Sequence, residues 1–410
     1  MASDSATALI DALHDLTRDL RWAWMGGDAV FAAIDDERWR RCVGNPVRML
    51  QETPPARFEQ LAGDEPFRAR LEAVRAVVDQ DRARPTADVP GPIAFFCAEY
   101  AVHRCLPIYS GGLGVLAGDI LKQASDQALP MVAVGLMYRE GYFHQRIDAT
   151  GWQQESWQRA DLERLPLELV RAGDGEPVTV RVPIGTDDIV AQAWRARVGG
   201  VDLLLLDTDR PENDPVARWI TARLYVGDPR LRLAQYLVLG IGGVRLLEAL
   251  GVEPAVVHMN EGHAAFAALE LAARERRRGA DVETALAAAR SRTVFTTHTP
   301  VPAGNDTYAP DEVTGAVGRL ADEAGLGSDG LLALGRTRPD DAGEPFGVTQ
   351  FALRTSRKAN GVSARHGEVA REMWQALDVP IGSVTNGVHL PTWLGEPMRE
   401  LLDRALGEGW

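Results

Sequence analysis

Residues 93–137 read IAFFCAEYAVHRCLPIYSGGLGVLAGDILKQASDQALPMVAVGLM, in which two short apolar runs enclose a helical pattern. The runs Ile93–Cys97 and Met131–Met137 have the length and continuous hydrophobicity of strands that are buried on both faces. Between them, Val115–Ser125 repeats apolar residues at helical spacing. Because a strand, a helix and a strand in this order form a parallel βαβ unit, the stretch predicts an α/β fold.

The same alternation continues after this unit. Further buried strands are predicted at Val201–Leu206, Ala255–His258 and Thr293–Thr297, and helices at Leu231–Leu250, His263–Arg278 and Val282–Arg290. Alternating residues at Leu167–Val182 and Ile189–Val198 predict an antiparallel insertion, and the Gly-, Asp- and Pro-rich residues 322–348 predict a long surface loop. The whole pattern is typical of one doubly wound, Rossmann-like sheet.

The chain before this alternation has helical periodicity. Apolar residues recur at spacings of three and four in Leu9, Leu13, Leu16, Leu20 and Trp24. Charged residues and three prolines between residues 79 and 92 then prevent a helix from continuing. We therefore expect a helical N-terminal region, residues 1–88, that packs as a layer beside a Rossmann-like domain, residues 89–395.

The composition narrows the class of protein. The 410 residues include 44 basic and 58 acidic side chains, a formal net charge of −14, which disfavours nucleic acid as a partner. No apolar run approaches the roughly 18 residues of a membrane span, and the first thirty residues lack a secretory pattern. Cys42, Cys97 and Cys105 form no CxxC pair. These features favour a cytoplasmic protein with no membrane partner.

A glycine-rich segment, Tyr109-Ser110-Gly111-Gly112-Leu113-Gly114, leads into the predicted helix at 115–125. Glycines let backbone N–H groups approach an anion, and the helix N-terminus adds partial positive charge. The segment matches neither the dinucleotide GxGxxG nor the P-loop. A phosphate or sugar phosphate is the expected ligand, and a tight turn without a ligand is the structural alternative.

Three segments carry polar clusters at or near predicted strand ends. They are His258-Met259-Asn260-Glu261-Gly262-His263, then His298-Thr299-Pro300, then Val384-Thr385-Asn386-Gly387-Val388-His389. Because ligands of doubly wound sheets bind at the carboxyl ends of the strands, these side chains are candidates for binding sugar hydroxyls. A helix N-cap cluster, a structural histidine and an Asn-Gly turn remain the respective alternatives.

Other chemistries lack support in the sequence. There is no GxSxG elbow, no cysteine beside a base and no HExxH metal pattern, so we expect no metal site. Trp152 and Trp157, with the polar residues 153–155 between them, would suit a sugar-stacking wall. We favour a place for both tryptophans in the hydrophobic core.

Taken in order, these motifs resemble the α-glucan (glycogen or maltodextrin) phosphorylase family, in its bacterial and archaeal type with an extra helical N-terminal region. The resemblance rests on LPIYSGGLGVLAGD (106–119), GLMY (135–138), GWQ (151–153), HMNEGH (258–263), FTTHT (295–299), ANGVS (359–363), HG (366–367) and VTNGV (384–388). It spans nearly the whole chain and covers the N-terminal half of such an enzyme. The resemblance implies an allosteric enzyme of carbohydrate metabolism.

The resemblance implies a GT-B glycosyltransferase fold, with two Rossmann-like domains facing across a cleft. It implies phosphorolysis of a terminal α-1,4-linked glucose to α-glucose 1-phosphate, with pyridoxal phosphate serving through its phosphate group. The histidine whose main chain stabilises the developing sugar cation matches His298. The residues that would bind substrate and phosphate are Gly111, Gly112, Leu113, Glu261, His263 and Asn386.

The lysines set this chain apart from a complete phosphorylase. In the family, the Schiff-base lysine and the residues that hold the substrate phosphate belong to the second domain. The chain has two lysines, Lys122 and Lys358, and neither matches the cofactor lysine. We therefore expect this chain to supply the glucan side of the cleft, without covalent pyridoxal phosphate and inactive without a complementing C-terminal half. Residues 396–410 would begin the crossover to that missing domain, and a homo-oligomer is a further possible assembly.

Two alternative functions stay open. A glycogen or starch synthase shares the Gly-Gly-Leu-Gly loop, although such enzymes usually carry a lysine just before it, where Tyr109-Ser110 stand here. A truncated, non-catalytic glucan-binding or assembly protein would use the same polar clusters for binding alone.

Overall fold

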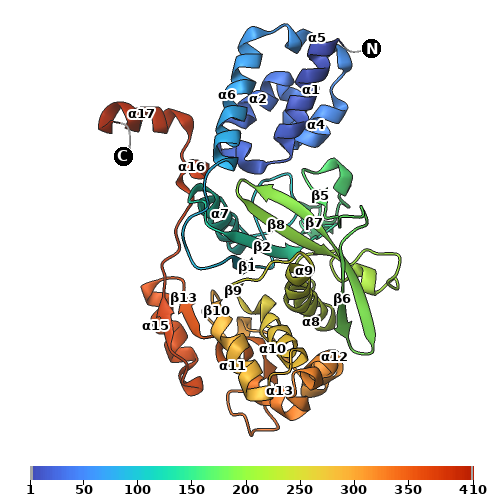
Figure 1. Ribbon diagram of the computed structural model, residues 1–410, viewed down its shortest axis with the longest axis vertical. Helices are drawn as coiled ribbons and strands as arrows, with labels where there is room; N and C mark the ends of the chain where they lie inside the picture. The colour runs from blue at the N-terminus through green and yellow to red at the C-terminus, as the bar shows by residue number, and fades with distance from the viewer. Residues whose placement is uncertain (1–2, 408–409) are drawn as a thin grey trace.

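The N-terminal region is built from short amphipathic helices, each with one apolar face buried against the others. They are α1 (Asp4–Thr17), the 3₁₀ helix η1 (Leu20–Trp24), α2 (Gly27–Ile34), α3 (Asp36–Arg41), α4 (Pro46–Glu52), α5 (Pro55–Ala62) and α6 (Glu65–Arg82). The computed structural model describes residues 3–407 and 410. Figure 1 shows these helices as a separate layer at one end of the molecule.

The centre of the molecule is a ten-stranded sheet. Its strands are β1 (Ile93–Phe96), β2 (Met131–Leu136), β5 (Glu168–Leu169), β6 (Thr179–Ile184), β7 (Asp187–Val198), β8 (Val201–Asp207), β9 (Val256–Asn260), β10 (Thr293–Thr296), β13 (Lys358–Gly361) and β14 (Ile381–Ser383). The order is β14-β13-β10-β9-β1-β2-β8-β7-β5, with β6 on β7. All pairs from β14 to β8 are parallel, which explains the continuous apolar runs of the inner strands.

The sheet is wound in two directions from β1. Helix α7 (Gly112–Asp126) connects β1 to β2 on one side. The chain later returns through α8 (Pro229–Leu237), the π-helical segment η4 (Val238–Gly242) and α9 (Gly243–Ala249) to β9 on the other side of β1. It then continues through α10 (Ala267–Arg277) and α11 (Val282–Arg292) to β10. Right-handed crossovers in opposite directions put their helices on opposite faces of the sheet, as Figure 1 shows. The gap between β1 and β9 is the topological switch point.

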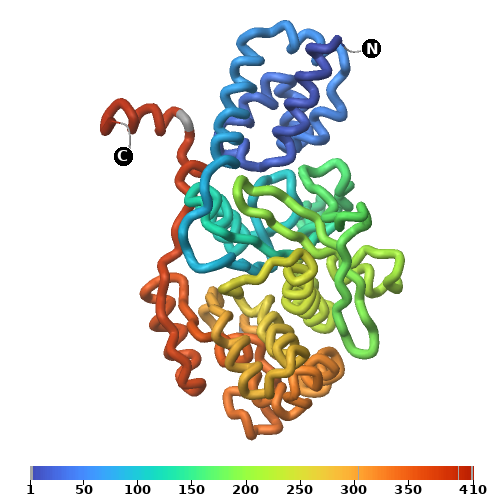
Figure 2. Tube along the Cα trace, in the orientation of Figure 1, coloured from blue at the N-terminus to red at the C-terminus, as the bar shows by residue number. Residues whose placement is uncertain are grey.

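The remaining elements surround this frame. They are the hairpin β3 (His144–Ile147) and β4 (Gln153–Ser156), the pair β11 (Thr307–Tyr308) and β12 (Phe346–Gly347), the helices α12 (Pro310–Glu323), α13 (Gly327–Gly335), α14 (Val348–Thr355), α15 (Ala364–Met373), α16 (Leu390–Trp393) and α17 (Glu396–Leu406), and the 3₁₀ turns η2 (Leu162–Arg164), η3 (Ala217–Trp219), η5 (Gly262–Ala264), η6 (Pro302–Gly304) and η7 (Gln375–Leu377). Figure 2 shows α17 lying apart from the sheet. Residues 1–2 and 408–409, which belong to the expected N-terminal region and crossover, lie outside the described residues.

The predicted fold class is confirmed: the chain is α/β, with a helical N-terminal region and a doubly wound, largely parallel sheet. One local prediction was wrong. Residues 322–348 are not one long loop, because Leu331 and Leu332 are buried and form helix α13 between glycine-rich turns. The predicted antiparallel segment is confirmed: β5 and β6 pair antiparallel with β7, and β7 pairs antiparallel with β8, so these strands extend the main sheet.

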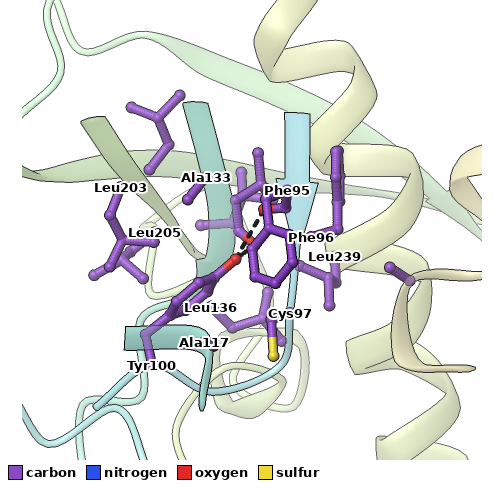
Figure 3. Close-up of a cluster of buried hydrophobic side chains, with 14 of the residues drawn as sticks. Phe95, Phe96, Cys97, Tyr100, Ala117, Ala133, Leu136, Leu203, Leu205 and Leu239 are labelled. Carbon is purple, nitrogen blue, oxygen red and sulfur yellow. Dashed lines mark hydrogen bonds between the residues drawn. The ribbon is translucent and has the colours of Figure 1, made fainter. Parts of the chain in front are cut away.

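The core beneath the switch point is closely packed. Phe95 and Leu205 are buried on one face of the sheet, and Phe96 and Leu136 are buried on the other (Figure 3). The buried Tyr100 hydroxyl points at the carbonyl oxygens of Phe95 and Val134, 2.8 and 2.9 Å away. This hydrogen bonding joins the segment after β1 to both strands, so the residues that follow β1 start from a rigid support.

Candidate functional site

The sheet places a cavity of about 380 Å³ at the switch point. Four of the residues expected in the site, Leu113, Glu261, His263 and His298, line it. They come from the start of α7, the end of β9 and the end of β10, which the sequence separates by up to nearly two hundred residues. The tertiary structure therefore brings the glycine loop and two of the three polar clusters to one cavity, where doubly wound sheets bind ligands.

The glycine loop is held by a carboxylate that the sequence reading did not single out. Glu99, only 2% exposed, accepts hydrogen bonds from the N–H groups of Ser110 and Gly111 at 2.6 and 3.2 Å. The Tyr225 hydroxyl donates to its other oxygen at 2.9 Å. A side chain on Gly114 would bring its Cβ within 2.9 Å of the Glu99 carboxylate, so the glycine allows this contact.

The first turn of α7 faces open space. A Cβ on Gly111 or Gly112 would meet no atom of the described residues within 4 Å. The N–H groups of a first helical turn have no acceptors within their helix, and they carry partial positive charge. Because Glu99 takes the Gly111 N–H, the N–H groups of Gly112 and Leu113 are candidates for binding an anion.

His298 is held in one orientation by Asn260. Its Nε2 lies 2.7 Å from the Asn260 Oδ1, while the Asn260 Nδ2 donates to the Cys97 sulfur at 3.3 Å. This arrangement makes Asn260 Oδ1 the acceptor, so Nε2 carries the proton. Burial, together with the neighbouring histidines, lowers the pKa of His298 to about 4. The imidazole is therefore neutral at physiological pH, and Nδ1 is its proton-free nitrogen.

Glu261 binds backbone rather than a charged partner. One oxygen of its carboxylate accepts from the N–H groups of His298 and Thr299 at 2.8 and 3.0 Å, and from the Thr299 hydroxyl at 3.1 Å. Burial raises the pKa of Glu261, and these donors oppose the rise. The residue also has a positive φ of 70°, a conformation that costs free energy in a non-glycine residue. The fold thus uses Glu261 to fix the main chain of residues 298–299.

His263 forms an aromatic wall of the cavity. Its ring lies 5.2 Å from the ring of Tyr236 and 6.2 Å from that of Tyr225. Tyr236 in turn donates to the Asp306 carboxylate, which also pairs with Arg232 at 2.9 Å. Burial lowers the pKa of His263 to about 4, so its imidazole ring is uncharged at physiological pH.

Asn386 lies apart from these residues. It is exposed and does not line the cavity, and its N–H donates to the carbonyl oxygen of Val362 at 3.0 Å. This bond places it just beyond the carboxyl end of β13, which neighbours β10 in the sheet. Asn386 therefore belongs to the same edge of the sheet as the cavity, one strand further out.

A second cavity, of about 420 Å³, shares Tyr225 with the first. Trp157, Tyr142 and Phe143 line it, and the Arg223 guanidinium lies 4.0 Å from the centroid of the Trp157 ring. The expectation that Trp152 and Trp157 belong to the core was wrong. Trp152 is 74% exposed on the β3–β4 hairpin, because that two-stranded sheet stands away from the main core.

Neither lysine reaches the cavity, and both lie in the described part of the chain. Lys122 is buried on α7, where its Nζ donates to the Thr392 hydroxyl at 3.2 Å. Lys358 begins β13 and is exposed. Among residues 3–407 and 410, no three His, Cys, Asp or Glu side chains gather as a cation site.

Sequence comparisons identify the relatives of this chain. Glycogen phosphorylase of Mycobacterium tuberculosis is 44% identical over 93% of the chain, maltodextrin phosphorylase of Thermococcus litoralis 39% over 98%, and glycogen phosphorylase of Aquifex aeolicus 36% over 98%. The matches cover 48%, 49% and 58% of those proteins. This chain matches the N-terminal half of α-glucan phosphorylases. It spans about half the length of the curated relatives it matches.

A family model also matches residues 7–106, which include α1 apart from its first three residues, the other N-terminal helices and β1. Its description is a protein of unknown function (DUF3417). The matched region of this chain therefore includes Glu99, which accepts hydrogen bonds from the glycine loop. No helix in the described part of the chain is long and apolar enough to cross a membrane.

Three residues that build the site were missed at the level of sequence. Glu99 accepts from the Gly111 N–H, the Tyr225 ring lies beside that of His263, and Asp306 lines the same cavity. Glu99 follows the end of β1 by three residues, so the strand-end rule that selected Glu261 would have found it. Tyr225 and Asp306 lie in connecting segments, where no local pattern predicts what they contact.

Proposed function

We propose that this chain provides the glucan side of an α-glucan phosphorylase active site. In this proposal the terminal glucose of an α-1,4-glucan binds at the switch-point cavity, and phosphate cleaves it to α-glucose 1-phosphate. The observation that carries the proposal is the convergence of Leu113, His263 and His298 on one cavity. The named relatives support the same reaction class.

The geometry suggests a role for each group. The N–H groups of Gly112 and Leu113 would bind a phosphate oxygen at the N-terminus of α7. The neutral His298 and the aromatic wall around His263 would contact the sugar, whose ring offers hydroxyls and apolar C–H faces. Glu261 would act as a positioning residue, because its hydrogen bonds orient the backbone of His298 and Thr299. Fixed dipoles of this kind stabilise charge that develops during bond cleavage.

Pyridoxal phosphate fits this site only in part. Its phosphate group matches the open first turn of α7, where Gly111 and Gly112 leave space. Its aldehyde carbon has no partner lysine, since Lys122 is engaged with Thr392 and Lys358 is exposed at β13. In the family the cofactor supplies a phosphate that exchanges a proton with the substrate phosphate. We propose that any lysine adduct forms outside residues 1–410.

The adjoining aromatic cavity extends the proposal to longer glucans. Tyr225 lies between the two cavities, and Trp157 offers a ring face beyond it. Aromatic rings pack well against the apolar faces of sugars while polar groups at their edges bind hydroxyls. A glucan chain would leave the first cavity past Tyr225 and contact Trp157.

Calorimetric titration of residues 1–410 with maltoheptaose tests the binding half of the proposal. Saturable binding of maltoheptaose, with none of an equally long β-linked cellodextrin, is the expected result. Mixing the chain with the remaining half of the Thermococcus litoralis relative, plus pyridoxal phosphate and phosphate, tests catalysis. Release of glucose 1-phosphate that requires both polypeptides is expected.

The same experiments separate the alternatives. Transfer of glucose from a nucleotide sugar instead of phosphorolysis would favour a synthase. Glucan binding without phosphorolysis in the reconstituted mixture would favour a binding or assembly protein. Absence of maltoheptaose binding would contradict the proposed function altogether.

A further inference from the structure

The 3₁₀ helix η1 belongs to the N-terminal region and contacts the Rossmann-like domain. It lies within the matched region described as of unknown function. Its two tryptophans and its arginine are all buried. Two segments that matter for the site, helix α7 and the stretch that follows Asn386, both contact it.

The first contact is with the C-terminal end of α7. The Arg21 guanidinium, 3% exposed, donates to the Ser125 hydroxyl at 3.1 Å and to the Asp126 carboxylate at 2.9 Å. The same guanidinium pairs with Asp81 of α6 at 2.7 Å. The Trp24 Nε1 adds a hydrogen bond of 3.2 Å to the same Asp126 oxygen. Arg21 and Trp24 therefore tie α7 to the N-terminal helices.

The second contact is with the segment after Asn386. His389 is fully buried, its Nε2 lies 2.9 Å from the other Asp126 oxygen, and its N–H donates to Asp119 at 3.0 Å. The Trp24 ring meets the His389 ring edge-on, with centroids 5.6 Å apart. Trp393 Nε1 also donates to Asp119, at 2.8 Å. This segment is thus anchored on α7 and on η1 at once.

The hydrogen bonds of this cluster form a connected chain. Lys122 donates to the Thr392 hydroxyl at 3.2 Å, and that hydroxyl lies 2.7 Å from His389 Nδ1. An ionised carboxylate can only accept, so His389 Nε2 donates to Asp126 at the other end of the ring. Charged groups with such specific partners fix one arrangement of the elements that carry them, whereas apolar packing tolerates several.

We propose that the N-terminal helical region is a positioning module for the active site, with Arg21 and Trp24 clamping α7 and His389 together. Helix α7 begins at the glycine loop, and Asn386 precedes His389 by three residues. The clamp would fix the predicted phosphate-binding and glucose-binding segments relative to each other. This inference rests on the proposed function for the roles of those segments, although the clamp itself is a property of the fold.

The test compares Trp24→Leu with Trp39→Leu in residues 1–410. Trp39 is equally buried, but it packs on Phe31 and Trp22 inside the N-terminal region. Hydrogen exchange followed by mass spectrometry reports the protection of each segment. Loss of a hydrogen bond to a charged group predicts about tenfold faster exchange in residues 385–394 and 110–118 of Trp24→Leu. Trp39→Leu should leave both segments at the wild-type rate.

Two outcomes overturn the clamp: unchanged exchange in Trp24→Leu, or an equal increase in Trp39→Leu, which would show only general destabilisation. Thr392→Val removes the hydroxyl that bonds Lys122 and His389. It provides a second test of the clamp if Trp24→Leu does not fold. It should speed exchange of residues 19–25, and no change there would also contradict the clamp.

Maltoheptaose titration of the same variants links the clamp to the site. Trp24→Leu should bind maltoheptaose several-fold more weakly than Trp39→Leu does. Wild-type affinity in Trp24→Leu would refute the positioning role even if exchange increased. If the wild-type chain binds no maltoheptaose, the proposed function fails, while the exchange comparison still decides whether the clamp exists.

Discussion

Glu99 shows how one buried carboxylate organises the site at the scale of a residue. It accepts from two consecutive N–H groups of the glycine loop and from the Tyr225 hydroxyl. Each donor would otherwise lose a partner in a partly buried place, which costs about 1–3 kcal/mol per group. Glu99 therefore decides the conformation in which the glycine loop presents its remaining N–H groups.

Replacing Glu99 tests this role. Glu99→Ala should lower the free energy of unfolding by about 3 kcal/mol and speed exchange of residues 110–114, because it removes all three acceptor contacts. Glu99→Gln keeps one oxygen toward Ser110 and Gly111, and its amide can donate to Tyr225. It should cost less than about 1 kcal/mol. Urea unfolding measures both, and equal stability of the two variants would contradict the role.

The β3–β4 hairpin and the segment after it matter at the scale of an element. The hairpin projects from the main sheet, so Trp152 is exposed, while Trp157 turns inward to the aromatic cavity under Arg223. Identical residue types five positions apart thus have different surroundings. Only Trp157 is placed to contact a glucan that extends past Tyr225.

This difference gives a matched pair of variants. Trp157→Ala should weaken maltoheptaose binding about tenfold, because an aromatic contact is worth about 0.5–1.5 kcal/mol beyond its buried area. Trp152→Ala removes the same side chain from outside the cavity and should stay within twofold of wild type. Calorimetric titration of both variants measures the affinities. Equal losses would argue against a glucan path along the aromatic cavity.

At the scale of the whole molecule, buried histidines make the free energy of unfolding depend on pH. Burial lowers the pKa values of His258, His263 and His298 to about 4, and that of His103 to about 3. In the unfolded chain these histidines bind protons near pH 6.5. Between pH 6.5 and 4 the unfolded state therefore binds more protons than the folded state, and the free energy of unfolding rises with pH.

Acidification from pH 7 to 5 should destabilise the protein, with a slope of up to about 1.4 kcal/mol per pH unit for each such histidine. His258→Gln should remove the contribution of one histidine to this slope. The variant should still fold, since glutamine can bond the Thr296 hydroxyl that lies 2.8 Å from His258 Nε2. The same substitution at the exposed His144 is the control. Urea unfolding at each pH checks this, and a flat profile in the wild-type chain would contradict it.

The sequence alone determined the class of the fold and the elements that carry the site. Continuous apolar runs, helical spacing and the glycine segment are local signals, because burial on two faces and helix geometry act over a few residues. They sufficed for the positions of the inner strands along the chain and for the polar clusters at strand ends, whereas the family followed from the resemblance of the ordered motifs. They failed at residues 322–348, where abundant glycine concealed helix α13.

Only the tertiary structure decided which of these residues meet. It put Leu113, His263 and His298 around one cavity, left Asn386 one strand further out, and committed the Gly111 N–H to Glu99. It also joined η1 to α7 and His389 through Asp126. Such contacts depend on which strand lies beside which, and the winding of the sheet fixes that through non-local packing. No spacing within one segment encodes it, which is why the partners of Glu99 and Arg21 appear only in the folded chain.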